Sequence, residues 1–325
     1  MKKGSRNTIT DVAGVKIGHV TLYDKLSDRD TVCTGVTAIL PHTGNIFEEK
    51  VRAASFVLNG FGKTAGLVQV NELGMLESPI MLTNTFSVAA VLQGTMEWML
   101  EENPEIGDST SSLNIVVGEC NDSHLNSMRL MAVKPEHARE AIKKADTDFA
   151  QGAVGAGKGM ICYGVKGGIG SASRLAEDGD LSYTVGALLL TNFGRKGEFR
   201  GADFSGADPK KPDGSVMMIL ATDAPLESRQ LERLAKRAAI GLGRTGTTVH
   251  NGSGDIVIAF STAAKISHRA EGAFSSDWLL RDSHPIMSEL FGAAVEATEE
   301  AVYQSIRHAE TTEGRLGRVV EKGEF

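Results

Sequence analysis

Two short runs of residues that are apolar except at their ends limit the folds open to this chain. The runs are SVMMILAT at 215–222 and GDIVIAFS at 254–261. A strand that is apolar on both of its alternating faces has to be covered on both faces, so each run predicts a strand inside a sheet. Segments with helical periodicity at 226–242 and 286–308 follow the two runs and are predicted to be amphipathic helices.

The remaining elements are predicted from periodicity and from chain-breaking residues. We expect one or two short strands in 8–23, further strands at 34–40, 113–119, 159–165 and 181–191, and helices at 87–100 and 134–145. Strands come in runs and helices come in runs, without strict alternation of the two. This order favours sheets layered with helices over a doubly wound Rossmann sheet. A layered fold of this kind can hold all 325 residues in one domain.

Composition excludes several classes of protein. The net charge is −7, with 34 Lys and Arg against 41 Asp and Glu, so no basic face for nucleic acid is expected. No apolar run approaches the roughly 18 residues that span a bilayer, so we expect no membrane contact and a cytoplasmic location. Three widely spaced cysteines, Cys33, Cys120 and Cys162, predict small buried residues and no disulfide framework. The eight histidines show no metal-binding spacing, and no metal site is expected.

The junction between Gly214 and Ser215 suggests a chemistry. Residues 195–214 are polar and rich in Gly and Pro, and Ser215 opens a buried strand directly after them. A cut at this junction would leave Ser215 with a free α-amino group of pKa near ~8, which can act as general base for its own hydroxyl. Gly214 has no Cβ, so its carbonyl is open to attack by the Ser215 hydroxyl and the cut can be self-catalysed. The same residues, Asp-Gly-Ser after Pro, are also typical of an ordinary turn.

Two polar clusters could complete such a site. Ser253 and Asp255, in NGSGD, are two residues apart and would point to the same face of an extended chain, where they could hold the amine of Ser215. Asn192 follows the strand expected at 181–191, where its amide could donate to an oxyanion. Taken alone, each cluster is also typical of a turn.

These pieces belong to a longer series of motifs that runs through almost the whole chain. The series is GVKIGHVT, TGVTAILP, NGFGKTAGL, ESPIMLTNT, VVGECND, GAVGAGKGM, GVKGGIGSASR, TNFG, DGSVMMILATDAPL and NGSGDIVIAFST. It resembles the self-processing aminopeptidases that include L-aminopeptidase/D-esterase and the β-peptidyl aminopeptidases. The resemblance implies an α/β fold of four layers, an αββα sandwich that is similar to the N-terminal-nucleophile hydrolases but has a different strand order. It also implies one domain cut into 1–214 and 215–325, and a homo-oligomer, a tetramer of cut protomers.

The resemblance also implies roles for single residues. The nucleophile of the family falls on Ser215, its serine-plus-acid pair on Ser253 and Asp255, and its oxyanion asparagine on Asn192. The acidic residue that receives the free amino group of the substrate falls on Glu119, and a carboxylate is well suited to bind an ammonium ion.

Two positions depart from the family pattern. The acid of the pair is Asp255, where the family has Glu, and Asn121 stands where the family has an aromatic residue near the substrate. These departures affect the contact to the amine and the substrate preference more than the chemistry. Asn84, in TNT, is expected either to shape the substrate pocket or to be a turn residue that bonds its own backbone.

The function expected from the resemblance is that of a serine aminopeptidase. It would release N-terminal residues from small peptides, amino-acid amides or esters, without a metal or an organic cofactor. The stereochemistry of the residue and the α or β position of its amine stay open. Two alternatives remain: an acyltransferase of the N-acetylornithine type on a related fold, and a binding protein that keeps the fold but does not cut itself. The glycine-rich segment 155–159 lacks both nucleotide-binding spacings and is expected to be a place of close backbone packing.

Overall fold

The computed structural model describes residues 1–203, 214–269 and 272–325. Two large sheets form its centre. The smaller sheet has the strand order β1-β2-β5-β6. Its strands are β1 (Lys16–Lys25), β2 (Thr31–Leu40), β5 (Ile80–Asn84) and β6 (Val116–Cys120). Only the β5–β6 pair of this sheet is parallel.

The larger sheet has the order β4-β3-β12-β11-β10-β9. Its strands are β3 (Glu49–Gly60), β4 (Met75–Leu76), β9 (Ile169–Asp178), β10 (Leu181–Asn192), β11 (Ser215–Thr222) and β12 (Gly254–Ser267). All neighbours are antiparallel except β11 and β12, which pair in parallel. Two short hairpins complete the strands: β7 (Ile161–Cys162) with β8 (Val165–Lys166), and β13 (Thr312–Glu313) with β14 (Val319–Val320).

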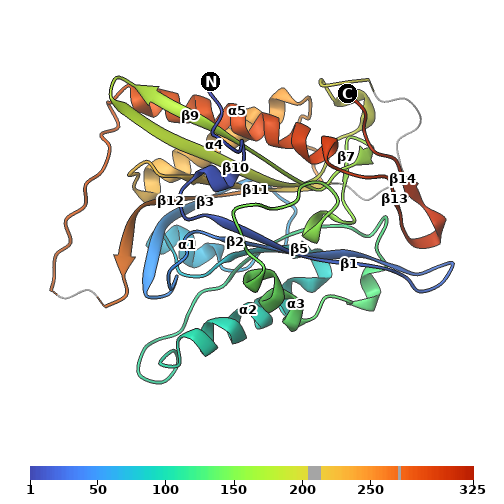
Figure 1. Ribbon diagram of the computed structural model, residues 1–325, viewed down its shortest axis with the longest axis horizontal. Coiled ribbons are helices and arrows are strands. Elements are labelled where there is room, and N and C mark those ends of the chain that lie inside the picture. The colour runs from blue at the N-terminus through green and yellow to red at the C-terminus, as the bar shows by residue number, and fades with distance from the viewer. Residues whose placement is uncertain (204–213, 270–271) are drawn as a thin grey trace.

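Helices cover the outer face of each sheet. Figure 1 shows α4 (Ser228–Arg244) and α5 (Ile286–Arg307) along the larger sheet, and α2 (Val88–Glu102) and α3 (Pro135–Lys143) along the smaller one. The short α1 (Leu67–Leu73) packs beside β3 and β4. The layers are therefore helix, sheet, sheet, helix, which confirms the predicted αββα sandwich.

The side chains of β11 show why this strand lies inside the sandwich. Val216, Met218 and Leu220 belong to the core that packs under α4 and α5. Met217 and Ile219 point the other way, into the core between the two sheets. Alternate apolar side chains thus fill two separate cores, as the run SVMMILAT predicts.

The prediction was wrong for one strand and incomplete for several. Residues 159–165 form no single strand, because the chain turns between β7 and β8 through Tyr163 and Gly164, both at positive φ. β3, β5 and β9 were not predicted; β9 reads IGSASRLAED, whose small polar residues give no strong apolar alternation. The structure also holds two parallel pairs bridged by a helix, β5-α2-β6 and β11-α4-β12.

Other expectations agree with the structure. Cys33, Cys120 and Cys162 are all buried. The glycine-rich segment is a place of close backbone packing: a Cβ at Gly159 would lie 2.4 Å from the carbonyl oxygen of Cys33. Of the polar segment expected at 195–214, residues 204–213 lie outside the described part of the chain.

Candidate active site

Three neighbouring strands of the larger sheet bring polar residues to the same end of the sheet. Ser215 begins β11, and the register pairs it with Asn192 at the end of β10 and with Gly254 at the start of β12. Ser253 and Asp255 flank that glycine, so the residues predicted from separate motifs are neighbours across the sheet. Ser215 is 3% exposed and therefore lies at the bottom of the site rather than on the surface.

The smaller sheet reaches the same point through the end of β6. Asn121 follows β6, and its backbone N–H donates a hydrogen bond of 3.3 Å to Ser215 Oγ. The Cys120 thiol lies within hydrogen-bonding range of the same hydroxyl, and burial is the main reason why the pKa of that thiol is well above its usual value. Ser215 thus lies where the two sheets of the sandwich meet.

A cavity of about 250 Å³ opens over the junction between residues 214 and 215. Its lining residues are Phe61, Lys63, Thr85, Glu119, Asn121, Gly214, Ser215 and Gly252. Of the three residues predicted to bind substrate, Glu119 and Asn121 line this cavity and Asn84 does not.

Glu119 is held in place by two donors. Its Oε1 accepts a hydrogen bond of 2.9 Å from the backbone N–H of Lys63, and its Oε2 accepts one from the Thr85 hydroxyl. The residue is only 4% exposed, yet it lines the cavity. A carboxylate fixed in this way can receive an ammonium ion with little loss of side-chain entropy.

Asn192 is fixed by both ends of its amide. Its Oδ1 accepts from the Ile161 N–H at 3.1 Å, and its Nδ2 donates to the Asn121 carbonyl at 2.8 Å. The first contact shows which end of the amide carries the N–H groups, and among the described residues the Asn121 carbonyl accepts from only one of the two N–H groups of Nδ2. Together with the Asn121 N–H, the other N–H of Nδ2 can form an oxyanion hole beside Ser215.

Ser253 and Asp255 form a buried pair. The Ser253 hydroxyl donates a hydrogen bond of 2.8 Å to Asp255 Oδ1. The second oxygen, Oδ2, is buried, and no group in the described ranges 1–203, 214–269 and 272–325 donates to it. Burial raises the pKa of Asp255 to about 6, against the opposing effect of the Ser253 hydrogen bond. Because buried carboxylates normally have partners, this oxygen has room for one further donor or cation.

Gly214 occupies a position that excludes a side chain. A Cβ there would lie 2.5 Å from the Asn192 carbonyl oxygen and 2.7 Å from Phe193 Cα. The Gly254 N–H lies 3.3 Å from the Gly214 carbonyl oxygen and donates to it. The carbonyl that precedes Ser215 is therefore held and polarised by β12.

Asn84 has the geometry of the turn alternative. Its side chain is buried; Oδ1 accepts from the Phe86 N–H at 3.0 Å and Nδ2 donates to Thr34 Oγ1 at 2.8 Å. Its neighbour Thr85 lines the cavity in its place. The motif TNT therefore marked the correct segment, one residue away from the side chain that contacts Glu119.

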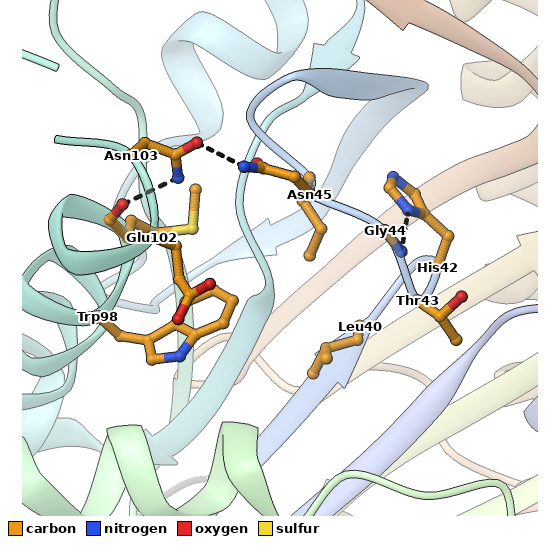
Figure 2. A pocket seen from close by; sticks show the side chains of 10 residues that line it. Leu40, His42, Thr43, Gly44, Asn45, Trp98, Glu102 and Asn103 are labelled. Atoms are coloured by element: carbon orange, nitrogen blue, oxygen red, sulfur yellow. Dashed lines mark hydrogen bonds between the residues drawn. The ribbon is translucent and has the colours of Figure 1, made fainter. Parts of the chain in front are cut away.

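A second cavity, of about 210 Å³, lies between the loop after β2 and the end of α2. Figure 2 shows that several of its polar groups bond one another: Asn45 donates to Asn103, and the Gly44 N–H donates to His42. No serine or cysteine lines it. The cavity over Ser215 is therefore the candidate active site.

In residues 1–203, 214–269 and 272–325, no group of three or more His, Cys, Asp or Glu side chains could hold a metal ion. No helix there combines the length and the apolar character needed to cross a membrane.

Comparison with known proteins identifies the family of the chain. The family model "Peptidase family S58" matches residues 7–320. A beta-peptidyl aminopeptidase, BapA, from Sphingosinicella microcystinivorans is 38% identical, over 99% of this chain and 86% of its own length.

Solved structures share the whole fold. The PH0078 protein from Pyrococcus horikoshii is 50% identical, with a TM-score of 0.93 over 99% of this chain and 93% of its own. The L-aminopeptidase D-Ala-esterase/amidase from Ochrobactrum anthropi is 33% identical, with a TM-score of 0.90 over 99% and 92%, and is described as a variant of the Ntn-hydrolase fold. The resemblance inferred from the sequence motifs is confirmed, and the chain belongs to peptidase family S58 as a hydrolase of the aminopeptidase type.

Proposed function

We propose that the chain cuts itself between Gly214 and Ser215, and that the freed Ser215 is the nucleophile and its amine the general base of an aminopeptidase. The observation that carries the proposal is the arrangement at the start of β11. The Ser215 hydroxyl lies 3.3 Å from the Asn121 N–H, next to Asn192 in the register, while the carboxylate of Asp255 has a buried oxygen without a donor among the described residues. An ammonium group at the start of β11 would supply the missing cation.

The cut proceeds by an acyl shift. Ser215 Oγ attacks the Gly214 carbonyl carbon, the C–N bond breaks, and the acyl group moves from nitrogen to oxygen while the hydroxyl proton ends on the new amine. Water then hydrolyses the ester, giving a carboxylate on Gly214 and a free hydroxyl and amine on Ser215. The Gly254 N–H that bonds the Gly214 oxygen supports the charge that develops on that oxygen.

Hydrolysis of a substrate uses the same groups. Glu119 binds the ammonium ion of the substrate, Ser215 Oγ attacks the carbonyl, and the amine of Ser215 takes the proton. Asn192 Nδ2 and the Asn121 N–H stabilise the oxyanion, and the leaving amine departs with the proton held by the Ser215 amine. Water then attacks the acyl-enzyme ester and restores the free serine.

The pair Ser253–Asp255 orients the amine of Ser215. The Ser253 hydroxyl donates its hydrogen bond to Asp255, so its oxygen lone pairs are free to accept from an ammonium group. Asp255 then stabilises that charge through the buried second oxygen. The shorter acid, Asp in place of Glu, fits a pair in which the serine bridges part of the distance.

The intact mass of freshly purified protein under denaturing conditions tests the cut. Two species that match 1–214 and 215–325 are expected, the second with a free N-terminal Ser. Ser215→Ala should give one species of 325 residues and no hydrolysis of peptides or amides. Ser261→Ala is the matched control, because Ser261 is a buried serine further along β12 whose hydroxyl bonds the Ala224 carbonyl. A Ser215→Ala protein with full activity would refute the mechanism.

Two wider expectations belong to the same proposal. Assembly into a tetramer of cut protomers is supported by the resemblance to the family. A cytoplasmic location stays a prediction. Size-exclusion chromatography with light scattering tests the first, and fractionation of the source cells tests the second.

A further inference from the structure

The loop between β3 and α1 is fixed against the site at two points. The Phe61 carbonyl lies so close to β12 that a Cβ at Gly254 would be 2.6 Å from its oxygen. Two residues later, the Lys63 N–H bonds Glu119 Oε1 at 2.9 Å. The side chains of Phe61 and Lys63 are thereby placed at the wall of the cavity, on the side where Glu119 receives an amine.

The two side chains contact each other at this wall. Phe61 is 62% exposed, and Lys63 Nζ lies 4.6 Å from the centre of its ring. No carboxylate within the ranges that the structure describes lies within 4.0 Å of Lys63 Nζ. Glu119 Oε1 and Oε2 each accept one hydrogen bond, from the Lys63 N–H and from the Thr85 hydroxyl, and each keeps a lone pair for a further donor. The cavity therefore presents a carboxylate and, beside it, an ammonium group held over an aromatic ring.

This pair of charges is suited to a substrate that carries both signs. A group bound to Glu119 lies beside the backbone of Lys63, so the Lys63 side chain can reach atoms close to the substrate's own ammonium ion. A carboxylate on the departing end of a peptide would lie beyond Ser215, on the other side of the bond that is cut. The second charged group that the cavity recognises therefore belongs to the residue that is released.

We propose that this enzyme prefers to release an acidic residue, in which the acyl group carries a carboxylate as well as its free amine. An N-terminal aspartyl group linked through either of its carboxyls has this chemistry. Glu119 binds the ammonium ion, Lys63 binds the carboxylate, and Phe61 holds the Lys63 side chain at the cavity wall. The inference rests on the proposed function, because it places the acyl group on Ser215.

The test compares two substrates that differ by one charge. Aspartyl and asparaginyl amides, each in α- and β-linked form where the chemistry allows, have nearly the same shape. We expect kcat/KM to be about tenfold higher for the better aspartyl substrate than for the asparaginyl one, as fits a charge-assisted contact at a half-open site. Lys63→Met should remove this ratio by lowering kcat/KM for the aspartyl substrate about tenfold. Lys236→Met is the matched control, since Lys236 also lies over a phenylalanine ring but on α4.

The outcomes separate the inference from the proposed function. Equal rates for the two substrates, or an equal loss of both in Lys63→Met, would overturn the preference while hydrolysis itself stands. If neither substrate is hydrolysed, calorimetric titration of the protein with the same aspartyl and asparaginyl amides decides: tighter binding of the aspartyl amide that Lys63→Met abolishes supports the inference, and equal binding overturns it. The intact mass of each variant shows independently whether residues 214 and 215 have been separated.

Discussion

In the uncut chain, Asp255→Asn should raise the free energy of unfolding at pH 7.5 and raise it about half as much at pH 5. The carboxyl is buried with one oxygen that lacks a donor among the described residues, and burial raises its pKa from 3.8 to about 6. In the window between these values the folded state keeps a proton that the unfolded state has lost. The free energy of unfolding therefore falls as the pH rises from about 4 to about 6.

The size of the effect follows from the shift. A shift of about two pKa units corresponds to about 3 kcal/mol of the free energy of unfolding, and all of it is lost above the pKa of the folded state. At pH 5 the loss is about half of that. The amide introduced by Asp255→Asn does not ionise, so the substitution removes a penalty of about 3 kcal/mol at pH 7.5 and about half of that at pH 5, less whatever an unpaired amide N–H costs.

Urea unfolding of paired variants measures this difference. Both proteins carry Ser215→Ala, which keeps residues 214 and 215 joined under the proposed mechanism, and intact mass confirms it. One of them also carries Asp255→Asn. Asp28→Asn, at an exposed position, controls for the change in net charge. A gain in the free energy of unfolding that is the same at pH 5 and pH 7.5, or a loss at pH 7.5, would refute the argument that the buried carboxylate of Asp255 destabilises the uncut chain.

In the cut protein, Asp255→Asn should not raise the free energy of unfolding. Once Ser215 has a free ammonium group, Asp255 gains the cation that its second oxygen lacks, and the pair becomes stabilising. Asp255→Asn introduced with Ser215 intact should then give no gain at pH 7.5 in whatever fraction is cut. The difference between the two backgrounds measures the coupling between the amine and the carboxylate.

Three further substitutions test single contacts of the site. Asn192→Ala should lower kcat by about 10²–10³-fold with little change in KM, because it removes an oxyanion donor; steady-state kinetics of the cut protein measures this. Glu119→Gln should raise KM for substrates with a free amine while the intact mass still shows the cut, because Glu119 is assigned to the substrate rather than to Ser215. Gly214→Ala should leave the chain whole, since its Cβ would lie 2.5 Å from the Asn192 oxygen, whereas Gly197→Ala, with open space around its Cβ, should be cut like the parent.

Sequence patterns identified the parts of the fold that are buried on both faces. β11 and β12 were predicted because their side chains fill two cores and are apolar in both directions. β9 was missed because its Gly and Ser residues pack closely: a Cβ at Gly170 would lie 1.9 Å from the Ala301 carbonyl of α5. Close packing of a helix on a strand demands small residues, and small residues carry no hydrophobic periodicity.

The same limit applies to the site. Ser215, Asn192 and the Ser253–Asp255 pair could be found because each stands at the end of a recognisable strand. Thr85 and Lys63 contact Glu119 from loops that are 34 and 56 residues away in sequence. A loop has no periodicity from which its contacts can be read, and only the fold shows which strand end it meets.

The strand directions explain why these residues meet. An α-amino group is free to serve as a base only at the start of a chain, so the nucleophile that we propose has to stand at the N-terminal end of its strand. Parallel pairing places the start of β12 beside the start of β11, and antiparallel pairing brings the end of β10 to the same end of the sheet. The crossover through α4 makes β11 and β12 parallel and thus places Asp255 beside the start of β11. An antiparallel hairpin would have placed the carboxylate at the opposite end of the sheet.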